Sequence, residues 1–339
     1  MVESNSVQRD PSHPFGPGCT NLAALRLGAE VVYASDDFFA DRQRMLQAES
    51  PIFYPDRFDD HGKWMDGWET RRRRRPGHEY SIVRLGRPGI IRGVNLCTRH
   101  FTGNYPPSAS IDVCLVEGDP DQATEWVSLL PAVELQGDAD NFFDVYSDQA
   151  WSHVRLNIFP DGGIARLRVF GQVYKDWASA SPGGIVDLAA LENGSQALIC
   201  NDAHFGAMEN LITPGNARNM GEGWETRRRR QPGYDWVIIA LGHPGRITRI
   251  EVDTAHFKGN YPDQCSLQAA SAPAGGAQAI AAQSLYWETL LPKQHLQADR
   301  LHRFDEQINS DLGAVSHVRL CIYPDGGVAR LRLWGSIGG

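Results

Sequence analysis

The sequence predicts an all-β protein that consists of two tandem antiparallel β-sandwiches. Three observations lead to this prediction. The chain repeats itself, each repeat contains short segments in which apolar and polar residues alternate, and no alternating pattern of strands and long helices occurs. The chain has 339 residues, which is long for one hydrophobic core and sufficient for two domains of ordinary size.

The duplication is visible in three aligned segments. Residues 66–86 (DGWETRRRRRPGHEYSIVRLG) and 222–242 (EGWETRRRRQPGYDWVIIALG) share 13 of 21 residues. HFTGNYP at 100–106 matches HFKGNYP at 256–262, and residues 153–171 match 317–335 at 14 of 19 positions. The first repeat has about ten extra residues around PDRFDDHGKW, and the second has an insertion, ASAPAGGAQAIAAQ, which we expect to be a surface loop.

The alignment divides the chain into four segments. Residues 1–24 are expected to be a flexible N-terminal segment, 25–177 the first repeat, 178–193 a linker that contains SASPGG, and 194–339 the second repeat. Within the first repeat, the predicted strands are SIVRL, IIRGVNLCT, SIDVCLVEG, HVRLNIF and IARLRVFG.

Short helices are expected where each repeat begins. In the second repeat the residues with helical spacing are Phe205, Met208, Leu211 and Ile212, and the expected caps are Asn201 and Asp202.

Composition excludes several function classes. The chain has 33 Lys and Arg against 41 Asp and Glu, a net charge of -8, which argues against binding to nucleic acid. No apolar stretch approaches the roughly 20 residues that span a bilayer, so we expect a cytoplasmic protein without membrane partners. The six cysteines lack CxxC spacing, and no HExxH or similar motif occurs. We therefore expect no disulfide framework, no metal and no cofactor.

The duplicated GWETRRRR segment is a candidate binding site. In an extended strand, Glu69 and alternate arginines would share one face of the sheet. Arginine presents a planar fork that grips a carboxylate or ureido oxygen through two hydrogen bonds. A solvated charged strand, or a salt-bridge network between the repeats that involves Glu69 and Glu225, is the alternative interpretation.

The HFxGNYP segments combine a proton-transfer side chain with hydrogen-bond donors. Histidine moves protons near neutral pH, and the asparagine amide and tyrosine phenol can donate hydrogen bonds. The alternative is a tight turn with a half-buried histidine, because Gly, Asn and Pro are ordinary turn residues. The segments FPDGG and YPDGG favour hairpin turns rather than catalytic roles for Asp161 and Asp325, and His153 and His317 are expected to be packing residues.

DGWETRR, an aromatic strand that ends in Leu-Gly, and a segment of the form D-T-x-[HF]-F-x-G-N-Y-P, all in two tandem copies, resemble the allantoicase family. The resemblance covers the chain from about residue 28 to 335. It implies two jelly-roll sandwiches similar to galactose-binding modules, and hydrolysis of allantoate to ureidoglycolate and urea in purine degradation. The implied partner is a small-molecule substrate, and we also expect a homo-oligomer.

The candidate site residues follow from these motifs. The candidate catalytic residues are Glu69, His100, Glu225, His256 and Asp253. The candidate substrate-binding residues are Trp68, Arg71, Arg72, Asn104, Tyr105, Trp224, Arg227, Arg228, Asn260 and Tyr261.

The two repeats differ from the family pattern in opposite ways. The first has Cys97 where the second keeps Asp253, whereas the first keeps Asp66 where the second has Glu222. Because only the second repeat keeps Asp253, we expect its set to matter for catalysis at least as much as the first set.

Two alternative functions remain open from the sequence. A tandem carbohydrate-binding module would have a similar fold, but it would favour exposed aromatic faces over the Arg, Glu, His and Asn found here. A hydrolase of another ureide, such as ureidoglycolate, would need nearly the same polar groups.

Overall fold

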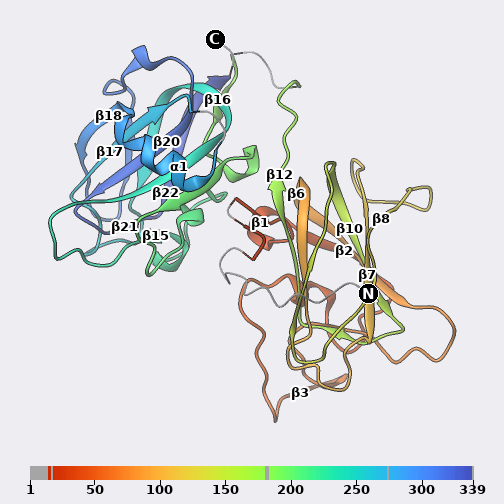
Figure 1. The fold of residues 1–339 in the computed structure, drawn as a ribbon. Coiled ribbons are helices and arrows are strands. Elements are labelled where there is room, and N and C mark those ends of the chain that lie inside the picture. Colours follow the sequence, from red (N-terminus) through yellow and green to blue (C-terminus); the bar gives the residue numbers. More distant parts are fainter. Residues whose placement is uncertain (1–13, 17, 180–182, 273–274, 338–339) are drawn as a thin grey trace. The chain divides into compact units, whose positions relative to one another are not determined.

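The computed structural model describes residues 14–16, 18–179, 183–272 and 275–337. The chain forms two compact units, Met1–Tyr174 and Lys175–Gly339 (Figure 1). Both units consist almost entirely of antiparallel strands, and each has one eight-stranded set of paired strands. The predicted all-β fold of two tandem jelly-roll sandwiches is therefore confirmed.

The first unit is built around one long strand, β6 (Glu79–Cys97). The other strands are β1 (Thr20–Asn21), β2 (Glu30–Ala34), β3 (Phe58–Asp59), β4 (Gly62–Lys63), β5 (Trp68–Glu69), β7 (Ser108–Cys114), β8 (Val127–Glu134), β9 (Asp140–Asp144), β10 (Ala150–Phe159), β11 (Gly163–Ile164) and β12 (Arg166–Val173). Two 3₁₀ helices, η1 (Leu25–Leu27) and η2 (Arg42–Leu46), lie near its start.

Strand β6 pairs with different neighbours along its two halves. Its first half pairs with β2 and β10, and its second half pairs with β9 and β12. The sequence Gly86-Arg87-Pro88-Gly89 lies between the halves, where glycine and proline favour a bend. The two strands predicted at 81–85 and 90–98 are thus one bent strand that takes part in both layers of the sandwich.

The second unit repeats this topology around β16 (Asp235–Asp253). Its other strands are β13 (Ile185–Asp187), β14 (Gln196–Cys200), β15 (Trp224–Glu225), β17 (Gln264–Ala270), β18 (Glu288–His295), β19 (Leu301–Phe304), β20 (Val315–Tyr323), β21 (Gly327–Val328) and β22 (Arg330–Ile337). Its helices are η3 (Leu191–Asn193), η4 (Met208–Ile212), η5 (Met220–Glu222), η6 (Ser284–Tyr286), η7 (Ser310–Leu312) and the α-helix α1 (Ala277–Gln283).

The core of each unit follows from alternation along its central strands. In β10, Val154, Leu156 and Ile158 are fully buried, and the residues between them are polar. The side chains of successive strand residues point to opposite faces, so this pattern places one apolar face inside the sandwich. Burial of such side chains contributes about 1.5 to 3 kcal/mol each and holds the layers together.

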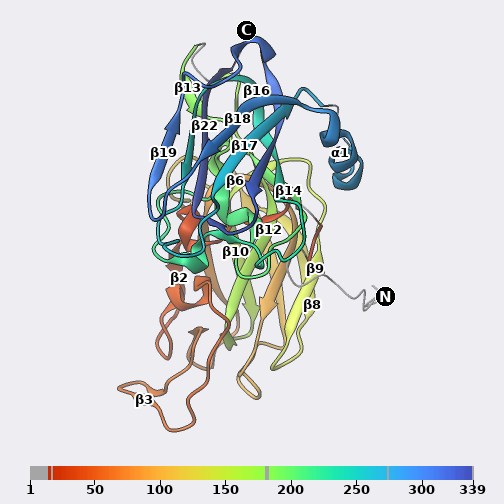
Figure 2. The same cartoon turned by 90° about the vertical axis from the view of Figure 1, so that its left-hand side faces the viewer.

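Two local predictions require correction. The caps predicted at Asn201 and Asp202 do not open a helix, because η4 begins after Ala207 and both side chains bind other groups. The insertion expected to be a surface loop contains α1, whose Ile280 is buried against Ile238 and Trp287. The two insertions nevertheless lie where the alignment of the repeats placed them (Figure 2).

The ends of the repeats extend further than the sequence suggested. Residues 20–23, assigned to the N-terminal segment, include β1, and Leu22 and Ala23 are fully buried. Within the predicted linker, β13 pairs with β22 and Leu188 is fully buried. Residues 1–13 and 180–182 of these predicted segments lie outside the described residues.

Among the described residues, no helix is long and apolar enough to cross a membrane. All six cysteines are free, and four of them, Cys97, Cys114, Cys265 and Cys321, are buried.

The two units should fold separately. Each has its own buried core and a length that suffices for an independent domain. We expect fragments 1–174 and 175–339, expressed alone, each to unfold in one cooperative thermal transition followed by circular dichroism. A fragment without a cooperative transition would show that the repeats depend on each other.

Candidate active site

Three repeated motifs meet at one place in the first unit. The PDGG turn joins the other two, because β11 pairs with β5 of the GWET motif. The Thr70 amide donates to the Gly162 carbonyl (3.2 Å), and the Gly162 amide donates to Thr70 Oγ1 (3.1 Å). The Gly163 amide donates to the carbonyl of Asn104 in the GNYP turn (2.7 Å). Residues that are distant in the sequence are thereby brought to one end of the sandwich.

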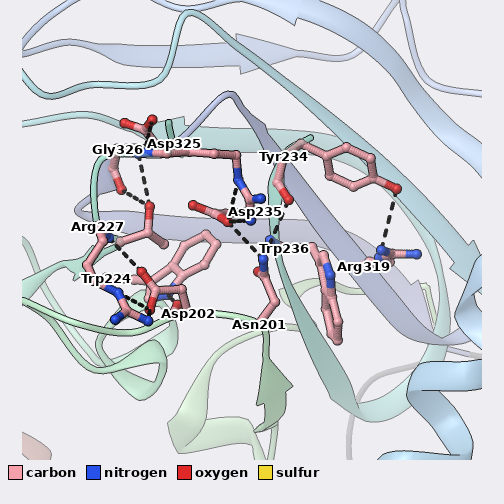
Figure 3. A network of polar contacts seen from close by, with 12 residues as sticks. Asn201, Asp202, Trp224, Arg227, Tyr234, Asp235, Trp236, Arg319, Asp325 and Gly326 are labelled. Carbon is pink, nitrogen blue, oxygen red and sulfur yellow. Dashed lines mark hydrogen bonds and ion pairs between the residues drawn. The ribbon is translucent and has the colours of Figure 1, made fainter. Parts of the chain in front are cut away.

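The second unit contains the same arrangement. Thr226 and Gly326 exchange the corresponding hydrogen bonds, and the Gly327 amide donates to the Asn260 carbonyl (2.8 Å). Figure 3 shows Gly326 and Asp325 beside the segment that carries Trp224 and Arg227. The Asp325 carboxylate accepts a hydrogen bond from the backbone amide of Arg229 (2.7 Å), which agrees with the structural role predicted for the PDGG motif.

The close packing of the PDGG turn explains the second glycine of the motif in each unit. A Cβ atom at Gly163 would lie 2.0 Å from the Phe101 ring, and one at Gly327 would lie 1.9 Å from the Phe257 ring. Both rings are fully buried. Because real Cβ atoms do not approach other atoms so closely, only glycine fits at these positions.

Trp68 and Trp224 are structural residues. Both indoles are fully buried, and their Nε1 atoms donate to the backbone carbonyls of Asp36 and Asp202, each at 2.8 Å. A side chain with no exposed surface cannot contact a substrate. The predicted substrate-binding role of these tryptophans is therefore corrected to one of fixing the segments that carry Asp36 and Asp202.

The arginine runs do not form a two-faced strand, because β5 ends at Glu69. Arg71 is held by Asp36, whose Oδ1 atom accepts from Nε at 2.9 Å and from Nη2 at 2.7 Å. Arg73 pairs with the buried carboxylate of Glu79. These ion pairs form within one unit, unlike the network between the repeats that the sequence left open.

The second unit repeats these arginine contacts. Arg227 pairs with Asp202 (Figure 3), and Arg229 pairs with the buried Asp235. The predicted ligands Arg72 and Arg228 are exposed. Arg228 lines a surface cavity of about 430 Å³ together with Asp202 and Asp235. These two carboxylates already balance the charges of Arg227 and Arg229.

Glu69 and Asn104 form the central polar pair of the first unit. Asn104 Nδ2 donates to Glu69 Oε1 at 2.7 Å, and Asn260 makes the same bond to Glu225. Burial raises the pKa of Glu69 above its usual range, and the hydrogen bond from Asn104 offsets part of this effect. A carboxyl group in this environment holds its proton to a higher pH than an exposed glutamate.

His100 and His256 occupy left-handed backbone conformations, with φ of 69° and 71°. The carboxylates of Asp138 and Asp299 stabilise these turns by accepting hydrogen bonds from the two histidine amides. His100 Nε2 lies 3.1 Å from the Pro51 carbonyl. A carbonyl only accepts, so Nε2 carries hydrogen and a neutral ring keeps its lone pair on Nδ1.

A cavity of about 330 Å³ lies over the Glu69–Asn104 pair of the first unit. Its lining comprises Phe39, Phe53, His61, Gly62, Lys63, Met65, Glu69, His100, Thr102 and Asn104. The structure therefore brings together three predicted residues of the first repeat, namely Glu69, His100 and Asn104. The sequence did not point to Phe53, His61 or Lys63, which come from the extra segment of this repeat.

The corresponding place in the second unit differs. Here η5 replaces the extra segment, and Met220 Sδ lies 3.9 Å from Asn260 Nδ2. His256 Nε2 lies 2.9 Å from the Ala217 carbonyl, so this ring also supports a neighbouring loop. The polar pair and the histidine are retained, whereas their surroundings are not.

The remaining predicted residues have mainly structural contacts. Asp253 accepts a hydrogen bond from the Ala255 amide (2.9 Å), which caps a turn. Tyr105 and Tyr261 pack against the buried rings of Phe101 and Phe257, respectively, and their neighbours.

A buried ion pair that the sequence did not assign supports the cavity. Arg166 Nη2 lies 2.7 Å from Asp66 Oδ2, and both side chains are almost fully buried. Arg166 also donates to the Glu49 carbonyl (2.9 Å), and Asp66 accepts from the Ile52 amide (3.0 Å). This ion pair fixes the segment that contains Pro51, whose carbonyl contacts His100 Nε2. The only sequence signal was the difference between Asp66 and Glu222.

No group of three or more His, Cys, Asp and Glu side chains in the described part of the chain is arranged to hold a metal ion. The expectation of a reaction without metal or cofactor remains a prediction.

The fold and the site define a tandem β-sandwich protein with a carboxyl, amide and imidazole set at one end of each repeat. A family model described as "Allantoicase repeat" matches residues 20–174 and 186–338. A "Probable allantoicase" of Pseudomonas aeruginosa (strain UCBPP-PA14) is 57% identical over 317 residues, covering 93% of this chain and 95% of that protein. One of Ralstonia nicotianae is 53% identical over 330 residues, covering 97% and 98%.

A solved structure agrees with the sequence comparisons. The crystal structure of the allantoicase of Saccharomyces cerevisiae has a TM-score of 0.76 and 34% identity to this chain, and it covers 94% of this chain and 93% of its own. The chain belongs to the allantoicase family.

The glycine contacts provide a test of the motif packing. We expect Gly163→Ala to lower the free energy of unfolding by about 1 to 3 kcal/mol, because the added methyl group meets the Phe101 ring. Chemical denaturation measures this change. Gly103→Ala is the matched control, since a Cβ atom there meets nothing within 4 Å. Equal effects of the two substitutions would contradict the packing argument.

Proposed function

We propose that the chain hydrolyses allantoate to ureidoglycolate and urea, a step in purine degradation, and that the reaction takes place at the Glu69–Asn104 pair of the first unit. The family supports the reaction. The observation that carries the location is the cavity in which Glu69, Asn104 and His100 meet. Allantoate has a carboxylate and two ureido groups on one carbon atom, so a site for it needs a proton donor, a base and polar ligands.

Glu69 is the proton donor in this proposal. The bond between the central carbon and one ureido nitrogen breaks with its electron pair moving to nitrogen, and the Glu69 proton is transferred to that nitrogen to release urea. The lone pair of the remaining ureido nitrogen stabilises the positive carbon that is left. A carboxyl group whose pKa is raised by burial is suited to this transfer.

Water then attacks the carbon atom, and His100 takes a proton from it through Nδ1. The imidazole is oriented for this by its Nε2 contact with the Pro51 carbonyl and by the Asp138 carboxylate at its amide. Asn104 donates to Glu69 with its amide nitrogen, so its carbonyl oxygen remains to accept a ureido N–H. Positioning of this kind accounts for much of the rate enhancement by enzymes.

We place the reaction in the first unit, whereas the sequence favoured the second because only that repeat keeps Asp253. Burial raises the pKa of Glu69, and a cavity lies over its carboxyl group. Asn260, the partner of Glu225, has Met220 against its amide, and Asp253 caps a turn. Self-association and a cytoplasmic location remain predictions from the sequence, which sedimentation analysis and cell fractionation would test.

Substitution of the two glutamates separately tests the location. In wild-type protein, nuclear magnetic resonance should show urea and ureidoglycolate forming from allantoate. Glu69→Gln keeps the size of the side chain but removes the proton, and turnover should fall about 100-fold or more. Glu225→Gln is the matched control and should retain most of the activity. The opposite result would place the reaction in the second unit, and sugar binding without turnover would favour a carbohydrate-binding module.

The hydrogen bond from Asn104 makes the pH profile a second test. This bond lowers the pKa of Glu69, so Asn104→Ala should raise it further. Because the protonated carboxyl group is the active form, activity is lost as the pH rises through this pKa, and the alkaline limb of kcat/KM should move to higher pH. Asn260→Ala should leave the limb in place. A shift to lower pH in Asn104→Ala would contradict the role of Glu69 as the proton donor.

A further inference from the structure

The extra segment of the first repeat forms a hairpin at the edge of the cavity. Strands β3 and β4 pair Phe58 with Lys63 and Asp59 with Gly62. Figures 1 and 2 show the segment that carries β3 extending beyond one end of the first unit's long strands. His61, Gly62 and Lys63 on this hairpin line the same cavity as Glu69 and Asn104. The hairpin therefore forms one wall of the site.

Lys63 is the positive charge on this wall, and it has no carboxylate partner. Its Nζ atom lies 4.7 Å from the centre of the Phe53 ring and 6.0 Å from that of Phe58. Among the described residues, no carboxylate comes within ion-pair distance of Lys63. Aromatic rings attract an ammonium group without neutralising it, so they can hold this charge in position.

The arginines near the site are placed differently. Asp36 already binds the Arg71 guanidinium through two contacts, and Glu79 binds that of Arg73. The charge of each of these two guanidinium groups is thus already balanced by a carboxylate of the protein. Lys63 would gain a carboxylate partner without losing one, which favours it as the anion-binding group.

We propose that Lys63 binds the carboxylate of allantoate and thereby sets the orientation of the substrate. This proposal rests on the function proposed above. With the carboxylate at Lys63 on the hairpin, the ureido groups would lie in the cavity that Glu69 and Asn104 also line. Selection for a ureide that carries a carboxylate then depends on a segment that only the first repeat has.

The second repeat lacks this element. Asn219 stands four residues before Gly223, as Lys63 stands four residues before Gly67, and it is neutral. Arg218, the nearest cation before this position, pairs with Glu222. Even though Glu225, Asn260 and His256 are retained, the second unit has no lysine at this position to receive the substrate carboxylate.

Steady-state kinetics of the full chain test the role of Lys63. In Lys63→Met, KM for allantoate should rise about 10- to 100-fold, the loss expected for one charged hydrogen bond, whereas kcat should change much less. Inhibition by ureidoglycolate should weaken by a similar factor, and inhibition by urea, which has no carboxylate, should not change. Lys63→Arg should restore part of the affinity, and Asn219→Met is the matched control.

The outcomes separate this inference from the proposed function. Unchanged KM and unchanged ureidoglycolate inhibition in Lys63→Met, with normal turnover by the wild-type protein, would overturn the role of Lys63 alone. Equal weakening of inhibition by urea and ureidoglycolate would also overturn it, because the variant would then have changed the whole cavity. A wild-type protein that releases no urea from allantoate would overturn both proposals.

Discussion

The packing of the PDGG turn against a buried phenylalanine ring is the constraint on which the rest of the site depends. Because Gly163 has no side chain, the turn can lie against the Phe101 ring and place its amide within 2.7 Å of the Asn104 carbonyl. The same turn exchanges hydrogen bonds with Thr70, the residue after Glu69. The turn thus fixes the separation between Glu69 and Asn104, although these residues are 35 positions apart in the chain. A polar pair held by packed backbone keeps one geometry, which is the kind of support that a preorganised site requires.

The duplication allowed much of the fold, and part of the site, to be predicted from the sequence. A motif that occurs twice shows which residues both repeats keep, but it does not show whether a residue binds substrate or supports the fold. Glu69 and Trp68 are adjacent and equally repeated, yet one lines a cavity and the other is fully buried. The partner of Arg71, Asp36, lies 35 residues earlier and outside the GWETRRRR motif, so the motif alone could not reveal that the charge of Arg71 was already balanced. Lys63 was missed for the opposite reason, because a comparison of the repeats gives no weight to a segment present in only one.

The two repeats have kept the same interior and changed what surrounds it. In the first unit, Arg155 pairs with Asp112 on the neighbouring strand. The corresponding residue beside Arg319 is Gln268, and this arginine is almost fully buried against the rings of Trp236 and Tyr234 (Figure 3). Arg155 also lies over the Trp126 ring, so the second unit has lost the ionic contact and kept an aromatic one at the same position in the sheet. The exchange of the hairpin for η5 is a change of the same kind. The two units have the same strand pairing, whereas the loops between their strands differ.

In the proposed mechanism, the hairpin also connects substrate binding with proton transfer. Burial governs the pKa of Glu69, with Asn104 as the opposing influence, so a wall that excludes water from the cavity favours the protonated carboxyl group. Lys63 lines the same cavity, but burial and Asn104, not its charge, govern the pKa of Glu69. In the proposed complex, a substrate held by its carboxylate at Lys63 would displace water from Glu69. Loss of water raises the pKa of a carboxyl group, so binding of the substrate would support the protonation state that the release of urea requires.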